Sequence, residues 1–232
     1  MMSNSLNQAA WVGGTSTYKF GHNSIPNIPI TGAPSDTNWN RSAMLHDGTT
    51  YRLYFFKGSS DDTIYQFGFN RATGAYEYGF NSIPELKLTG APRDASAESF
   101  AMLHDGTTYR LYLRRLGHPD ILYQFGFNRA SRDYEFGFNS IQVLHVDHAP
   151  ADVDWSSWGM LHDGSAYRFY AFKQGTKDKF YQGAYNPAAR EYQFGFNSIP
   201  EFRLDGMPAD SNLSDFPMLH DGRDYRFYML KN

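Results

Sequence analysis

One five-residue string, Met-Leu-His-Asp-Gly, occurs four times in this chain at a constant spacing. The copies begin at Met44, Met102, Met160 and Met218, so successive copies are 58 residues apart. Four intervals of this length equal the 232 residues of the chain. A period that holds over a whole chain predicts repeated supersecondary units that bury their apolar faces against one another.

Four strands are predicted in the first complete unit, over residues 42–46, 51–56, 64–69 and 76–80. Asp47-Gly48 favours a hairpin between the first two, because glycine adopts positive φ without steric cost. Aromatic residues dominate the later strands, as is typical of pleated sheets. The connector over residues 82–100 contains Pro84, Gly90 and Pro92. We expect it to be an ordered loop that could include one helical turn.

Apolar side chains occupy both faces of these strands, so each sheet must be covered on both sides. Four small sheets arranged radially satisfy this requirement and predict an all-β, four-bladed β-propeller. Residues 7–21 align with the third and fourth strands of a repeat, and residues 218–230 align with the first and second. We therefore expect a single domain over 1–232, with a ring closed by N-terminal strands that pair with C-terminal strands. A linear array or a sandwich is the alternative.

Composition excludes several classes of protein. The net charge of −3 lacks the basic character of a nucleic-acid binder, and an aromatic content of 17% excludes global disorder. No apolar run is long enough for a membrane span. The absence of cysteine excludes disulfides and thiolate-ligated metals. The first eight residues do not resemble a secretory signal, so we expect a soluble protein that is cytoplasmic or exported without a leader; the compartment is not fixed.

Residues 88–112 contain a Gly-Ala-Pro connector, an Ala-Met-Leu-His strand, an Asp-Gly turn and a Tyr-Arg-Leu-Tyr strand. This order resembles the hemopexin-like repeat, and the resemblance extends over all four copies. It implies a four-bladed propeller whose inner-strand carbonyls hold channel ions. The disulfide of that family has no counterpart here. Its inner-strand aspartate is not matched either, since Asp36, Asp94, Asp152 and Asp210 lie seven residues before the Ala43 position.

Three metal or ion sites follow from the sequence as hypotheses. Ring closure would bring four repeated imidazoles near one mouth of the channel, where they could bind a transition metal or support the adjacent turn: His46, His104, His162 and His220. His145, Asp147 and His148 depart from the repeat and have metal-ligand chemistry, although sequence drift is the favoured explanation. Unpaired inner-strand carbonyls suit a structural calcium or sodium ion in the channel.

Two further sets of residues are candidates for ligand binding. One arginine per repeat could recognise an anion, or could pair across strands or stack on an aromatic ring: Arg52, Arg110, Arg168 and Arg226. Tryptophans in the variable segments before the inner strands could stack on sugar faces or wedge between blades: Trp39, Trp155 and Trp158.

No catalytic fingerprint occurs in the chain, and four near-equivalent repeats argue against one asymmetric catalytic centre. We therefore predict a non-enzymatic binding module that presents loops and a channel to a small molecule, ion or protein. A multivalent lectin with one glycan site per blade or blade junction is the second hypothesis. A metal-dependent enzyme that uses residues 145–154 is the third.

Overall fold

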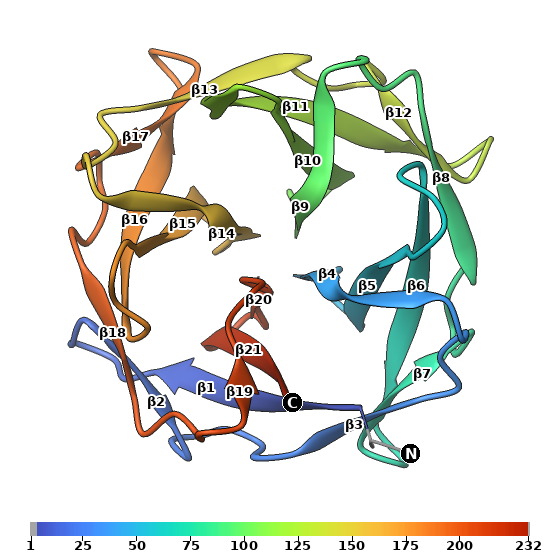
Figure 1. The fold of residues 1–232 in the computed structure, drawn as a ribbon, viewed down its shortest axis with the longest axis horizontal. Helices are drawn as coiled ribbons and strands as arrows, with labels where there is room; N and C mark the ends of the chain where they lie inside the picture. Colours follow the sequence, from blue (N-terminus) through green and yellow to red (C-terminus); the bar gives the residue numbers. More distant parts are fainter. Residues whose placement is uncertain (1–3, 232) are drawn as a thin grey trace.

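The computed structural model describes residues 4–231, which form 21 strands and no helix. The strands gather into four units around a central axis (Figure 1). None of the described residues forms a helix long and apolar enough to cross a membrane. The strands of the first three units are β4 (Thr37–His46), β5 (Tyr51–Lys57), β6 (Thr63–Asn70) and β7 (Ala75–Tyr78); β9 (Ala95–His104), β10 (Tyr109–Arg115), β11 (His118–Asn128) and β12 (Asp133–Phe136); and β14 (Val153–His162), β15 (Tyr167–Lys173), β16 (Lys179–Asn186) and β17 (Glu191–Phe194).

The fourth unit combines both ends of the described chain. Its strands are β19 (Ser211–Asn212), β20 (Met218–His220), β21 (Tyr225–Lys231), β1 (Ser5–Trp11) and β2 (Thr17–Phe20). Strand β1 pairs antiparallel with β21, from Leu6 opposite Leu230 to Ala10 opposite Arg226. The predicted pairing between N-terminal and C-terminal strands is therefore confirmed.

The connectors between units are strands rather than the expected loops with a helical turn. They are β3 (Ile28–Thr31), β8 (Glu85–Thr89), β13 (Val143–Asp147) and β18 (Phe202–Asp205). Leu86 and Leu88 are buried while Glu85, Lys87 and Thr89 are exposed, which is the period-two pattern of a half-buried strand. The loop prediction was wrong because this short alternation, which lies between proline and glycine, is stabilised as a strand by pairing with two neighbouring units.

Each connecting strand joins two neighbouring units by backbone hydrogen bonds. Strand β8 is antiparallel to β6 of the first unit and parallel to β12 of the second. Strands β13, β18 and β3 repeat this arrangement at the other three junctions. Twelve strands thus form a closed ring around the outside: β1, β3, β7, β6, β8, β12, β11, β13, β17, β16, β18 and β2.

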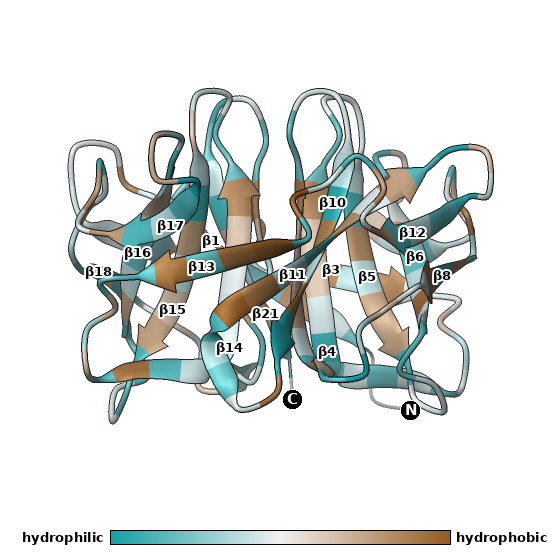
Figure 2. Cartoon of the chain, turned by 90° about the horizontal axis from the view of Figure 1, so that it is seen from above, coloured by the Kyte–Doolittle hydropathy of each residue, from teal (hydrophilic) through white to brown (hydrophobic). Residues whose placement is uncertain are grey.

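The apolar core lies between adjacent units. One cluster packs Tyr54 and Phe56 of unit 1 against Phe100 and Leu111 of unit 2, and three equivalent clusters fill the other junctions. Figure 2 shows hydrophobic segments along strands such as β11 and β13, while hydrophilic segments occur on strands and loops alike. Each sheet is therefore covered on both faces by its two neighbours, as the residue pattern requires.

The junction of units 4 and 1 differs from the other three. Ser42 stands where the other repeats have Phe100, Trp158 and Phe216. The buried Asp215 fills this space, and its Oδ2 accepts hydrogen bonds from the Ser42 backbone N–H at 2.7 Å and the Ser42 hydroxyl at 2.9 Å. Burial raises the pKa of Asp215 to about 7, although the two Ser42 hydrogen bonds act in the opposite direction.

The strand pairing predicts that the β1–β21 contact is essential for stability. Leu6 is completely buried in the cluster between units 4 and 1. We expect Leu6→Ala to lower the free energy of unfolding by about 2–5 kcal/mol, because it leaves a cavity in a packed core. Urea unfolding measures this change. Leu116→Ala is the control, since Leu116 is 52% exposed; equal effects of the two substitutions would contradict the role of β1 in closing the ring.

Asp215 predicts a pH dependence of stability. A carboxyl group with a raised native pKa contributes stability below its unfolded pKa of about 4, and this contribution is lost as the pH rises toward and past 7. As the pH rises across this window, the unfolding free energy of the unsubstituted chain should fall by up to about 1.4 kcal/mol per pH unit more than that of the Asp215→Asn variant. Urea unfolding at pH 5 and pH 8 tests the difference. The exposed Asp120→Asn should leave the slope unchanged, and parallel profiles for the native chain and Asp215→Asn would refute the assignment.

Candidate functional site

Two large pockets lie at equivalent junctions between units. The pocket between units 3 and 4 has a volume of about 390 Å³, and its lining includes Arg168, Tyr225, Trp11 and Tyr18. The pocket between units 2 and 3 has a volume of about 600 Å³ and is lined at the corresponding repeat positions by Arg110, Tyr167, Tyr185 and Tyr192. Both volumes lie in the range of small-molecule sites. We call these the junction pockets.

The same positions recur at the other two junctions. Arg52 corresponds to Arg168, and its neighbouring unit supplies Tyr109, Phe127 and Tyr134 at the equivalent positions. Arg226 is likewise followed by Tyr51, Phe69 and Tyr76. Two lining positions differ among the four junctions. One holds Trp11, Phe69, Phe127 or Tyr185, and the other holds Phe202, Ile28, Leu86 or Leu144. The repeat therefore places related residue sets at all four junctions, with differences at these two positions.

The arginine of each site is fixed by an aspartate at the Asp-Gly turn. In unit 3, Arg168 Nε donates to Asp163 Oδ2 at 3.0 Å. Asp163 Oδ1 accepts the backbone N–H groups of Ser165 and Ala166 at 2.9 and 2.6 Å. Burial opposes ionisation of Asp163, but these hydrogen bonds and Arg168 lower its pKa below the ordinary value. The pair is therefore ionised, and only 15% of the Arg168 side chain is exposed.

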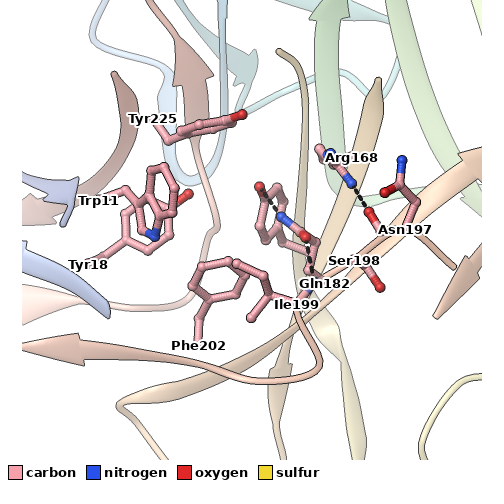
Figure 3. A pocket seen from close by; sticks show the side chains of 10 residues that line it. Trp11, Tyr18, Arg168, Gln182, Asn197, Ser198, Ile199, Phe202 and Tyr225 are labelled. Carbon is pink, nitrogen blue, oxygen red and sulfur yellow. Dashed lines mark hydrogen bonds between the residues drawn. The ribbon is translucent and has the colours of Figure 1, made fainter. Parts of the chain in front are cut away.

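A second contact directs the same guanidinium toward the pocket rim. Arg168 Nη1 donates to the backbone oxygen of Asn197, which has a φ of 43°. Asparagine tolerates this left-handed conformation better than most residues. The following Ser198 hydroxyl accepts the Gly195 N–H at 3.1 Å and closes the turn. Figure 3 shows Arg168, Asn197 and Ser198 along one side of the pocket.

Aromatic rings form the opposite side, and they come from strands at the two ends of the chain. Trp11 in β1 and Tyr225 in β21 meet edge to face, with ring centroids 5.3 Å apart (Figure 3). The Trp11 indole donates to the Thr15 backbone oxygen at 2.7 Å. The Tyr225 hydroxyl donates to Asp163 Oδ2 of unit 3 at 3.2 Å. Burial and the charge of Asp163 raise the pKa of Tyr225 to about 12, so this hydroxyl stays protonated at neutral pH.

A buried chain of polar groups lies behind each site. Gln182 Nε2 donates to the Tyr170 hydroxyl at 2.7 Å, and Gln182 Oε1 accepts the Ile199 N–H at 3.0 Å. Tyr170 also interacts with the Tyr18 hydroxyl of the next unit, and burial raises the pKa of both phenols. The other junctions repeat the set as Gln66–Tyr54–Tyr134, Gln124–Tyr112–Tyr192 and Gln8–Tyr228–Tyr76.

The predicted tryptophans line neither junction pocket. Trp158 is buried, stacks on Phe169 with ring centroids 5.6 Å apart and donates to the Ser99 hydroxyl at 2.7 Å, so its ring is covered by protein. Trp39 and Trp155 are partly buried against Phe55 and Phe169. These contacts match the wedge interpretation. The sequence predicted Arg110 and Arg168 but not Trp11, Tyr225, Tyr167 and Tyr185. Trp11 and Tyr185 were marked only by variation at a repeated aromatic position, whereas Tyr225 and Tyr167 lie at a position that is tyrosine in every repeat.

The four repeated histidines lie beside the turns and the narrow central cavity. Each imidazole packs on the tyrosine of its own hairpin, as His46 does on Tyr51 with centroids 4.8 Å apart. Burial lowers the pKa of His46. The cavity that these histidines help to line has a volume of about 10 Å³, which accommodates about one water molecule. An organic ligand does not fit there.

The third connector keeps its metal-ligand residues on the surface. His145 and Asp147 are exposed in β13, and exposed His148 follows that strand with a φ of 56°. His148 Nδ1 lies 3.5 Å from Asp147 Oδ2. Over residues 4–231, no group of three or more His, Asp or Glu side chains has an arrangement that could hold a metal ion. Neither the ring of four histidines nor the connector cluster is therefore assembled as a metal centre.

No family model and no curated protein matches this chain. Among solved structures, it is similar to an exo-β-1,3-galactanase from Phanerochaete chrysosporium with β-1,3-galactotriose, at 12% identity and a TM-score of 0.40, over 91% of this chain and 50% of the other. SapL1 lectin in complex with α-methyl fucoside matches at 14% identity and a TM-score of 0.36, over 98% and 65%. A putative 6-phosphogluconolactonase from Bacteroides uniformis matches at 13% and 0.33, over 94% and 57%. The chain thus spans about one half to two thirds of these proteins.

The buried polar chain predicts a measurable contribution to stability. Tyr170→Phe removes the hydroxyl that accepts from Gln182 and faces Tyr18. We expect the free energy of unfolding to fall by about 1–3 kcal/mol, because two buried polar groups lose a partner. Chemical denaturation measures the loss. Tyr185→Phe, at the partly exposed pocket wall, should change it by less than about 0.5 kcal/mol, and a neutral Tyr170→Phe would show that the network is not stabilising.

Proposed function

We propose that this chain is a four-bladed β-propeller of the kind its repeats predict, and that it is a non-enzymatic, multivalent protein that binds carbohydrate at its blade junctions. The observation that carries the proposal is the junction pocket, in which an aromatic wall faces fixed polar groups. One site per junction follows from the repeat. The hemopexin-like resemblance is compatible with this architecture and stays a prediction.

The chemistry of the pocket suits a neutral ligand with one apolar face and several hydroxyl groups. Trp11 and Tyr225 offer ring surface, on which the C–H groups of a sugar can pack. Asn197, Ser198 and Gln182 bring amide and hydroxyl groups to the same cavity, where they can donate to and accept from sugar hydroxyls. The Arg168–Asp163 pair adds directional donors while its charges compensate each other.

Binding without catalysis is favoured by the state of the charged groups. Asp163 accepts several hydrogen bonds and has a lowered pKa, so it is a poor proton donor at neutral pH. Tyr225 has a raised pKa and donates to that same carboxylate, so it is a poor base. The repeat gives every junction the same arginine, aspartate and tyrosine. Most glycoside hydrolases use two carboxyl groups, one protonated and one ionised, whereas this pair supplies a single ionised carboxylate.

A glycan array followed by calorimetry tests this function. The array should give binding to a sugar class. Titration with methyl glycosides of galactose, glucose, mannose, fucose and N-acetylglucosamine should then give more than one site per chain. Trp11→Ala should remove or weaken about tenfold the binding at one junction, since stacking and ring burial contribute about 1–3 kcal/mol.

Trp39→Ala is the matched control, because Trp39 packs on Phe55 outside the junction pockets. It should leave the affinity and the number of sites unchanged when the fold is intact by circular dichroism. The absence of binding to every glycan and glycoside, or equal losses for Trp11→Ala and Trp39→Ala, would refute glycan binding at the junctions.

A further inference from the structure

We infer that units 1 and 2 carry a second kind of site, which binds an acidic sugar through its sulfate or carboxylate group. The site in unit 1 is a pocket of about 270 Å³ between the β4–β5 and β6–β7 hairpins, with Thr50, Tyr51, Phe69, Arg71 and Phe80 in its lining. Unit 2 has the equivalent pocket of about 350 Å³, with Thr108, Tyr109, Phe127, Arg129 and Phe138. We call these the hairpin pockets. This inference does not rest on the proposed function, although Tyr51, Phe69, Tyr109 and Phe127 also stand at the aromatic positions of two junctions.

The charged group of each hairpin pocket is an arginine that the fold does not neutralise. Arg71 is exposed, and no carboxylate within residues 4–231 lies within 4.0 Å of its guanidinium nitrogens. Arg52 in the same unit, by contrast, is paired with Asp47 at 3.3 Å. Arg129 repeats the condition of Arg71 in unit 2. A guanidinium without an ionic partner at the edge of a cavity favours an anionic ligand, with which it forms two parallel hydrogen bonds.

The nearby carboxylates are already bound. Asp47 Oδ1 accepts the backbone N–H groups of Thr49 and Thr50 at 2.9 and 2.6 Å. Glu77 Oε1 accepts from Asn70 at 3.1 Å and from the Thr73 hydroxyl at 2.6 Å. The Thr50 hydroxyl contacts only Thr49 Oγ1, at 3.4 Å among the described residues, so it can turn its proton toward a ligand. The pocket therefore offers a cation and a hydroxyl donor.

Aromatic rings on the same pocket indicate a ligand larger than an inorganic anion. Tyr51 and Phe69 lie 5.7 Å apart between centroids, and Tyr109 and Phe127 lie 5.6 Å apart in unit 2. Phe80 and Phe138 complete the lining. A sugar ring with a sulfate ester or a carboxylate matches both halves of the pocket, since its C–H face packs on aromatic carbon while its anion meets arginine.

The other two units provide an internal comparison. At the position of Arg71 they have Pro187 and Gly13, and at the position of Thr50 they have Ala166 and Asp224. Unit 3 thus lacks both donors, and unit 4 places a carboxylate where the hydroxyl stands. Unit 4 also has Arg223 at the Thr49 position, but the carboxylate of the adjacent Asp224 disfavours an anionic ligand there. Two acidic-sugar sites per chain are therefore expected rather than four.

Calorimetric titration of the whole chain with galactose 6-sulfate and with galacturonic acid tests the inference. We expect two equivalent sites for at least one of these sugars, and the comparison shows whether sulfate or carboxylate is preferred. Arg71→Ala/Arg129→Ala should weaken that binding about tenfold or more, the loss expected for a charge-assisted hydrogen bond. Arg93→Ala/Lys177→Ala removes two exposed cations outside the hairpin pockets and should leave the affinity unchanged.

A gain-of-function variant and two further probes make the outcome decisive. Ala166→Thr/Pro187→Arg should add a third acidic-sugar site in unit 3. Methyl β-galactoside measures neutral sugar binding at the junction pockets. Its affinity should be unchanged in Arg71→Ala/Arg129→Ala, which separates the two kinds of site. Undiminished acidic-sugar binding by Arg71→Ala/Arg129→Ala, or inorganic sulfate binding as tightly as galactose 6-sulfate, would overturn the inference.

Discussion

The structure depends on one constraint: each small sheet has two apolar faces, and its own unit contains no element that could cover them. Four units arranged in a circle meet this constraint because every unit lies between two neighbours. Tyr54 and Phe56 of unit 1, for example, are covered by side chains of unit 2. The connecting strands then extend the contact from side chains to backbone, since β8 and its three equivalents hydrogen-bond two units at once. Side-chain packing and backbone pairing thus require the same circular arrangement.

Much of this architecture could be predicted from the sequence. The spacing of Met-Leu-His-Asp-Gly predicted the number of units. The alignment of residues 7–21 with the third and fourth strands of a repeat, and of residues 218–230 with the first and second, predicted the β1–β21 pairing. The connecting strands could not be identified with the same ease, because an alternation such as Glu85-Leu86-Lys87-Leu88 is short and lies between proline and glycine. Its hydrogen-bond partners belong to two different units. Such a strand is stabilised by tertiary context more than by its own residues.

The candidate site was predicted less completely than the fold. The arginines were recognisable because they recur, but their pairing with the turn aspartates depends on side-chain geometry. Trp11 and Tyr225 are 214 positions apart and meet only after the ring closes. Trp39 and Trp158, two of the candidate ligand-binding tryptophans, fill space beside Phe55 and Phe169. Residue type alone does not distinguish an aromatic wall from an aromatic wedge, since both functions use the same apolar surface.

The hydrogen-bonded outer ring has a consequence for recognition of surfaces that carry many copies of one ligand. Because the connecting strands join neighbouring units directly, the distances among the four junctions are set by the backbone rather than by a flexible linker. After a first ligand binds, a second on the same surface meets a neighbouring pocket at a high effective concentration only if its spacing matches the ring. Avidity would then report the density and geometry of the ligands as well as their chemistry.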